Sequence, residues 1–148
     1  MSRLTNIRPV FVKFVPKELD EGVLYISVPY GTTVHKCACG CGSKIALPIS
    51  PVKWRFMFDG DTVSLWPSVG NWSYPCQSHY WIEQNRIEWS SKWSPQKIEA
   101  GRARAKAARE RYLKSRAEPA EAKQSATELS ATEPGLGLID RIRGLFRR

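Results

Sequence analysis

The stretch HKCACGCGSK, residues 35–44, holds three of the chain's four cysteines at every second position, with glycines at 40 and 42. The fourth cysteine lies in YPCQSH, residues 74–79. Four thiols match the ligand number of a structural zinc site. Because alternate residues of a straight strand point the same way, the first stretch must bend to surround an ion, and the glycines permit that bend. We therefore expect zinc to join the two stretches through Cys37, Cys39, Cys41 and Cys76.

Other uses of the four cysteines fit this pattern less well. A disulfide between next-but-one cysteines would be strained, and redox pairs normally show a Cys-x-x-Cys spacing in a βαβ context. Free cysteines that pack as small apolar residues are a further alternative. Either histidine, His35 or His79, is an alternative ligand in place of one cysteine. Zinc is the metal that this donor set favours.

Short β-branched and aromatic runs, separated by turn residues, surround the cysteine stretches. The predicted strands are PVFVKFV (9–15), GVLYISVPY (22–30), WRFMF (54–58), TVSLW (62–66), HYWIE (79–83) and RIEW (86–89). Asp59-Gly60 between two apolar runs predicts one hairpin, and Gln84-Asn85 predicts a second. We expect a mainly β fold, a small antiparallel sheet or partial barrel stapled by the zinc site.

The sequence changes character near residue 95. All six tryptophans and all four cysteines precede that point, so we expect a zinc-binding β domain over residues 1–95. Residues 96–118 are rich in Ala, Arg and Lys but have few apolar positions, which predicts a basic, solvated helix. The composition of residues 119–135 predicts a disordered linker. Residues 136–148 place apolar side chains on one face at helical spacing, which predicts a short amphipathic helix.

The net charge of +9 is spread unevenly. Residues 1–95 carry ten Lys or Arg against seven Asp or Glu, a net of +3, and residues 96–148 carry thirteen against seven, a net of +6. The basic run of residues 97–116 has no base-stacking motif beside it, so we do not expect nucleic-acid binding. The one membrane role left open is a weak contact by residues 136–148. Signal-peptide features are missing from the N-terminus, so we expect a cytoplasmic location.

The histidines and nearby serines are candidates for catalysis. A serine nucleophile needs an imidazole base within hydrogen-bond reach. Ser78 and His79 would point to opposite faces of a straight strand, so His35 is the better base for Ser78 unless the strand bulges. Asn71 is a candidate oxyanion donor, as are backbone N–H groups. Ser68, in PSVGN, is expected to close a turn.

Four stretches together resemble a bacterial domain-of-unknown-function family, some of whose members lie in Bub-type operons for ubiquitin-like protein conjugation. They are LYISVPYGTTVHKCACGCGSK, LPISPVKW, DGDTVSLWPSVGNW and PCQSHYWIEQNRIEW, within roughly residues 8–93. The resemblance implies a deubiquitinase-like peptidase that processes or removes a ubiquitin-like protein. The matching positions are His35, Cys37, Cys39, Cys41, Ser68, Asn71, Cys76, Ser78 and His79.

Two hypotheses follow from these residues. In the first, the chain is a zinc-containing hydrolase that cleaves a peptide or isopeptide bond at a protein's C-terminus. Ser78 then attacks, with His35 or His79 as the base, and zinc is structural. In the second, the chain is a non-enzymatic zinc-binding module that docks a partner protein through exposed aromatic residues. A serine joined to a free histidine would favour the enzyme, and zinc ligation by both histidines would favour the module.

Overall fold

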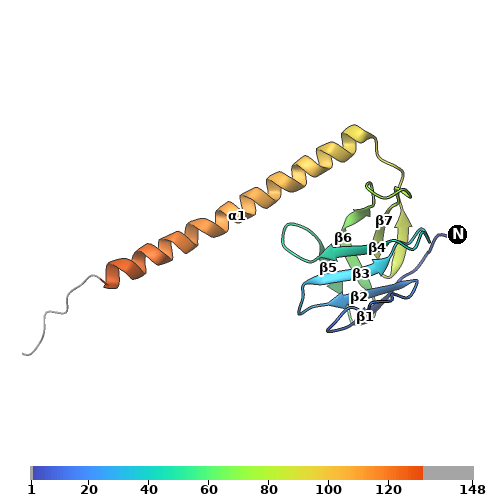
Figure 1. The fold of residues 1–148 in the computed structure, drawn as a ribbon, viewed down its shortest axis with the longest axis horizontal. Helices are drawn as coiled ribbons and strands as arrows, with labels where there is room; N and C mark the ends of the chain where they lie inside the picture. Colours follow the sequence, from blue (N-terminus) through green and yellow to red (C-terminus); the bar gives the residue numbers. More distant parts are fainter. Residues whose placement is uncertain (1, 132–148) are drawn as a thin grey trace, which may run out of the picture. The chain divides into compact units, whose positions relative to one another are not determined.

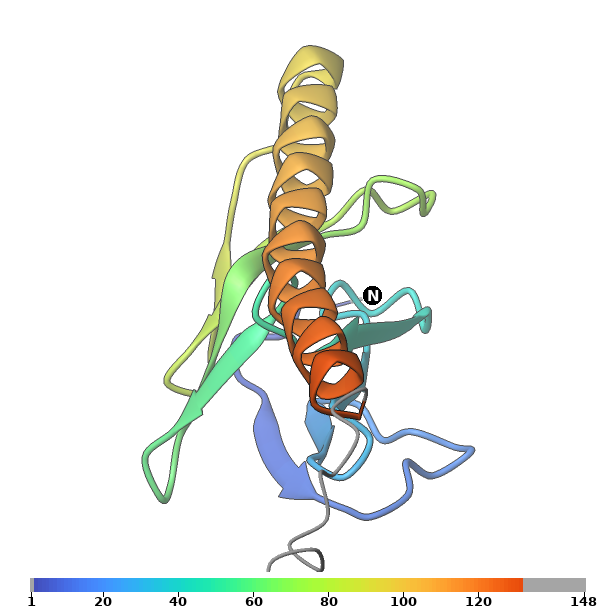
Figure 2. The ribbon, with the colours of Figure 1, turned by 90° about the vertical axis from the view of Figure 1, so that its left-hand side faces the viewer.

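The computed structural model of the chain describes residues 2–131 (Figures 1 and 2). It divides into two compact units, Met1–Arg109 and Glu110–Arg148. The first unit contains two four-stranded sheets, with strand orders β1-β2-β3-β4 and β5-β6-β7-β8. The strands are β1 (Arg8–Phe11), β2 (Val23–Ser27), β3 (Thr32–Lys36), β4 (Lys44–Pro48), β5 (Arg55–Phe58), β6 (Val63–Gly70), β7 (His79–Glu83) and β8 (Arg86–Trp89). The mainly β fold predicted from the sequence is confirmed.

The main hydrophobic core lies between the two sheets. Leu24 and Ile26 of β2 share one buried cluster with Leu65 of β6 and with Tyr80 and Ile82 of β7. These residues alternate along their strands, so each sheet turns one apolar face toward the other. The cysteine cluster packs against the same core, which places it between the sheets.

Strand β2 is buried along its whole length because both of its faces are covered. Its Val23 and Tyr25 belong to a second, smaller cluster on the opposite face, together with Leu19 and Val34. Strand β1 pairs with β2 in parallel, whereas every other strand pair is antiparallel. The sequence predicted an antiparallel sheet or partial barrel, and the β1–β2 pair adds a parallel neighbour to it.

Both predicted hairpins form. In the turn between β5 and β6, Asp59 accepts hydrogen bonds from the backbone N–H and the hydroxyl of Thr62, and these lower the pKa of Asp59 to about 2. Between β7 and β8, Gln84 and Asn85 both adopt positive φ angles, 47° and 64°, as a two-residue hairpin turn requires. Ser68 was expected in a turn, but it lies inside β6.

The single helix described, α1, spans Pro95–Ala131 and begins one residue before the predicted start at 96. Ser94 caps it, since its side-chain oxygen accepts a hydrogen bond from the backbone N–H of Lys97. The helix continues through residues 119–131, where composition predicted a linker, because Ala and Glu favour helix over coil. The remainder of the predicted linker and the amphipathic helix predicted at 136–148 lie outside the described residues. Within the described part, no helix is long and apolar enough to span a membrane.

Candidate active site and metal centre

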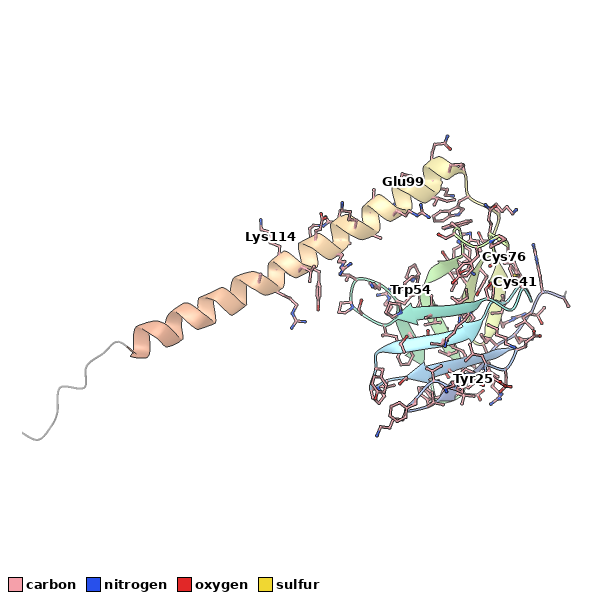
Figure 3. The ribbon with its side chains drawn as sticks, viewed as in Figure 1. Tyr25, Cys41, Trp54, Cys76, Glu99 and Lys114 are labelled. Atoms are coloured by element: carbon pink, nitrogen blue, oxygen red, sulfur yellow. The ribbon has the colours of Figure 1, made fainter. Side chains whose placement is uncertain are left out.

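The four cysteines come together at one end of the sheets, as the sequence predicted. Their Sγ atoms all lie within 4.8 Å of one another, and Figure 3 shows Cys41 beside Cys76. The Sγ atom of Cys37 is 3.4 Å from that of Cys39 and 4.0 Å from that of Cys76. A tetrahedral zinc ion with bonds of about 2.3 Å holds its sulfur ligands about 3.8 Å apart. The spacing of the thiols therefore fits a four-coordinate metal ion.

Two glycines produce the bend that brings the first three cysteines together. Gly40 and Gly42 have φ angles of 80° and 76°, which only glycine adopts without strain. The backbone N–H of Gly40 donates to the carbonyl of Cys37, and the N–H of Cys37 donates to the carbonyl of Ser43. The loop between β3 and β4 thus folds back on itself and turns its sulfur atoms toward Cys76.

The electrostatics of the cluster also favour a bound cation. Burial is the main cause that raises the pKa of Cys39 to about 12, so this thiol is neutral at pH 7 on its own. A hydrogen bond with Ser43 lowers the pKa of Cys41 to about 6. Four thiolates at these distances repel one another strongly unless a positive charge lies among them. A divalent metal ion supplies that charge and would allow all four cysteines to ionise.

Ser78 and Asn71 lie against the cysteine cluster. The Ser78 hydroxyl is 3.1 Å from the Sγ atom of Cys37. The Asn71 side-chain amide donates to Ser78 Oγ at 2.8 Å and to Cys37 Sγ at 3.4 Å. Both side chains are buried. Their hydrogen bonds support a cysteine sulfur, and among the described residues neither side chain is hydrogen-bonded to a histidine.

His35 lies deep in the core rather than beside Ser78. Its side chain is 0% exposed, and its Nε2 atom is 2.8 Å from the hydroxyl of Tyr80. Within the described residues its Nδ1 atom has no hydrogen-bond partner. Burial lowers the pKa of His35 to about 4, so the imidazole is neutral at physiological pH. Within the described residues, its hydrogen bond is with neither a cysteine sulfur nor a serine, which fits a residue of the core.

Among the described residues, His79 forms a serine–histidine pair with Ser68. Its Nε2 atom lies 2.9 Å from Ser68 Oγ, and its Nδ1 atom lies 3.1 Å from the backbone carbonyl of Ser91. A carbonyl only accepts hydrogen bonds, so Nδ1 carries the proton and Nε2 of the neutral ring is the acceptor. The Ser68 hydroxyl therefore donates to Nε2. This is the tautomer that a general base for serine requires.

A bulge in β6 brings Ser68 to His79. Leu65 pairs with Ile82, and Val69 pairs with Tyr80. An advance of four residues along β6 therefore matches an advance of two residues along β7. Beyond the bulge, Gly70 lies directly opposite His79, and Ser68 precedes it by two residues on the same face. The bulge itself leaves no periodic pattern, which explains why Ser68 could not be paired with His79 from the sequence.

Three indole rings surround the imidazole of His79. Its ring centroid is 4.9 Å from that of Trp72, 5.1 Å from that of Trp81 and 5.0 Å from that of Trp93. Gly70 makes room for this packing, because a Cβ atom there would lie 2.8 Å from Cε2 of Trp72. The indoles hold the ring of His79 in one orientation and leave it 2% exposed.

A cavity of about 520 Å³ opens beside this pair. Ser68 and His79 both line it, together with the indoles of Trp54, Trp72 and Trp93. Ser68 is half-buried, so its hydroxyl borders both the cavity and the imidazole. A serine hydroxyl that donates to an oriented histidine at the wall of an apolar cavity defines a candidate serine hydrolase.

The comparison with protein families agrees with this class. A family model described as "Bacterial ubiquitination-like system serine protease (BubE)" matches residues 11–90, more than half of the chain. The chain belongs to this family, and is a serine protease of a bacterial ubiquitination-like system. Membership implies protein partners within that system. Neither a curated protein nor a solved structure matches the chain.

Proposed function

We propose that this protease cleaves the peptide or isopeptide bond that follows the C-terminus of a bacterial ubiquitin-like protein, with Ser68 as nucleophile and His79 as general base. One observation carries the assignment of the two residues. Ser68 Oγ and His79 Nε2 are 2.9 Å apart, beside a cavity of about 520 Å³. The assignment keeps His79 from the sequence-based hypothesis and replaces Ser78 by Ser68.

The geometry supports a stepwise acyl transfer. Ser68 Oγ attacks the scissile carbonyl carbon while Nε2 of His79 takes the hydroxyl proton. The Nδ1–H bond to the Ser91 carbonyl holds the ring in place as it becomes positively charged. His79 then gives its proton to the leaving amine, and a water molecule activated by the same nitrogen hydrolyses the acyl ester. A backbone carbonyl thus takes the orienting position that a carboxylate has in many serine hydrolases.

The indole rings assist the same step. The rings of Trp72, Trp81 and Trp93 pack around the imidazole and would hold the imidazolium that forms during attack in the same orientation. His79 is almost fully buried among them, so little water reaches its ring. The proton removed from Ser68 is therefore retained on His79 until the leaving group can accept it.

We also propose that zinc is the metal at the cysteine cluster and that its role is structural. Cys37, Cys39, Cys41 and Cys76 supply four thiolates, which fill a tetrahedral zinc site and leave no open position for a substrate. The hydroxyl of Ser78 and the amide of Asn71 would donate to the Cys37 sulfur, as residues around metal ligands commonly do. Thiolate ligands persist in a reducing compartment, which supports the expected cytoplasmic location.

The test uses a fluorophosphonate probe, which modifies activated serines, on the wild-type chain and two serine variants. We expect the probe to label Ser68, as located by peptide mass spectrometry. Ser68→Ala should abolish both labelling and cleavage of a C-terminally extended ubiquitin-like protein from the same system. Ser78→Ala is the matched control, and it should retain labelling. Labelling at Ser78, or cleavage by Ser68→Ala, would remove Ser68 from the mechanism.

A further inference from the structure

The cavity beside Ser68 and His79 has two walls of different origin. One wall comes from the region of the two sheets and carries the three indoles of Trp54, Trp72 and Trp93. The other comes from the first turns of α1. Its residues are Ile98, Gly101, Arg102, Ala105, Lys106 and Arg109. These positions recur at spacings of three and four, so one face of the helix borders the cavity.

Trp93 fixes the start of this helical wall against the candidate active site. The Nζ atom of Lys97 lies 4.9 Å from the centre of the Trp93 ring. A Cβ atom on Gly101 would lie 3.4 Å from the same indole, so the helix backbone packs close to it. Trp93 in turn contacts the ring of His79. The helix face is therefore positioned by a residue that touches the proposed base.

The charges that line this cavity are all of one sign. Lys53, Arg102, Lys106 and Arg109 line it, and among the described residues around it there is no Asp or Glu. A cleft with low-dielectric walls and charges of one sign concentrates the electric field and attracts the opposite charge. Among the described residues that line the cavity, these cations share its walls with indoles and with no carboxylate. A carboxylate is the complementary group, since guanidinium and ammonium groups both bind it.

We propose that the α1 face formed by Arg102, Lys106 and Arg109 is the specificity wall of the protease, and that it selects peptide segments with acidic side chains next to the cleaved bond. An apolar side chain of the same segment would pack on the indoles of the opposite wall. The proposal rests on the proposed function only in placing the reacting bond at Ser68. The preference for acidic residues is a property of binding, and it can be measured without cleavage.

The test measures binding of short fluorescein-labelled peptides to the full-length Ser68→Ala protein by fluorescence anisotropy. Two peptides, amidated at the C-terminus, differ only in carrying glutamates or glutamines around a central phenylalanine. We expect the glutamate peptide to bind at least about tenfold more tightly, and this difference to shrink as salt is added. Equal binding of the two peptides would overturn the proposal.

Two triple variants decide whether the helix face is responsible. Arg102→Ala/Lys106→Ala/Arg109→Ala should remove the preference for glutamate. The matched control Arg104→Ala/Arg111→Ala/Lys114→Ala removes the same charge from positions that do not line the cavity, and it should keep the preference. An equal loss in both variants would show a non-specific effect of net charge and would overturn the assignment to this face.

Two further measurements separate this proposal from binding of a terminal carboxylate and from the assignment of Ser68 as nucleophile. A glutamine peptide with a free C-terminus tests a terminal carboxylate as the ligand, and tight binding by that peptide alone would overturn a preference for acidic side chains. Cleavage by Ser68→Ala together with a retained glutamate preference would reject the proposed nucleophile and keep the specificity wall. Loss of cleavage in Ser68→Ala without any glutamate preference would keep the proposed nucleophile and reject the specificity wall.

Discussion

Consecutive residues at the start of β7 serve two different sites. Ser78 and Tyr80 face the core between the sheets, where Ser78 contacts Cys37 and Tyr80 contacts His35. His79 faces the other way and meets Ser68 on β6. The first face belongs to the candidate metal centre, which maintains the fold, and the second belongs to the candidate catalytic pair. Adjacent polar residues on a strand therefore need to be assigned to a face before they are assigned a role.

The largest difference between the two faces of β7 should appear in metal binding and folding stability when a residue of the site at each face is substituted. Cys37→Ser should abolish metal binding and cooperative folding, because a structural zinc contributes on the order of 10 kcal/mol. Metal content of the purified protein and circular dichroism during heating measure the two effects. His79→Gln is the control from the opposite face, and it should retain one metal ion per chain. Metal loss in that control would make His79 a ligand and contradict the separation of the faces.

The second-largest difference is expected between substitutions of the two histidines. His79→Gln should lower kcat/KM for a ubiquitin-like substrate roughly 10³-fold or more, since it removes the general base. His35→Gln should cost about 1–3 kcal/mol of unfolding free energy and leave most of the activity, because His35 is buried in the core and hydrogen-bonded to Tyr80 there. Steady-state kinetics and thermal unfolding measure both quantities. A comparable loss of activity in stably folded forms of both variants would contradict the assignment of the base to one face.

A smaller effect is expected where a residue supports the metal centre without binding the ion. Ser78→Ala removes a hydroxyl beside Cys37 and leaves the Asn71 amide with one fewer acceptor. We expect metal affinity to fall by roughly 10- to 100-fold, as it does for groups that hydrogen-bond to ligands. Competition with a chelator measures this change. An unaltered metal affinity combined with lost proteolysis would return Ser78 to the catalytic site.

Local signals predicted much of the fold correctly. Asp59-Gly60 and Gln84-Asn85 indicated both hairpins, because turn residues between apolar runs act over a few positions. Three cysteines close together in the sequence, with glycines at 40 and 42 that permit a bend, indicated the cluster, which Cys76 completes. Strands β3 and β4, on either side of the cysteine loop, were not predicted. Strand β3 buries polar residues whose partners are distant in sequence, such as the Tyr80 hydroxyl for His35.

The candidate catalytic pair was harder to predict for a different reason. Ser68 and His79 meet only because β6 holds extra residues between its pairings with β7, and a bulge has no repeating signature. The orienting partner of His79 is a backbone carbonyl, which any sequence provides at every position. The composition of residues 97–116 did indicate a basic helix. That one face of this helix lines the cavity could not be predicted, because it depends on packing against Trp93.

The backbone carbonyl of Ser91 has a consequence for genetic studies of this protease. A side-chain carboxylate in that position would be removed by a single codon change, whereas a peptide carbonyl is retained whichever amino acid occupies position 91. Two hydrogen bonds of the His79 ring join three residues: Ser68, His79 and Ser91. A saturation screen for inactive clones should therefore find that Ser68 and His79 tolerate no substitution, whereas position 91 tolerates most. Only a change in the path of the chain, such as a deletion after β8, would reveal it.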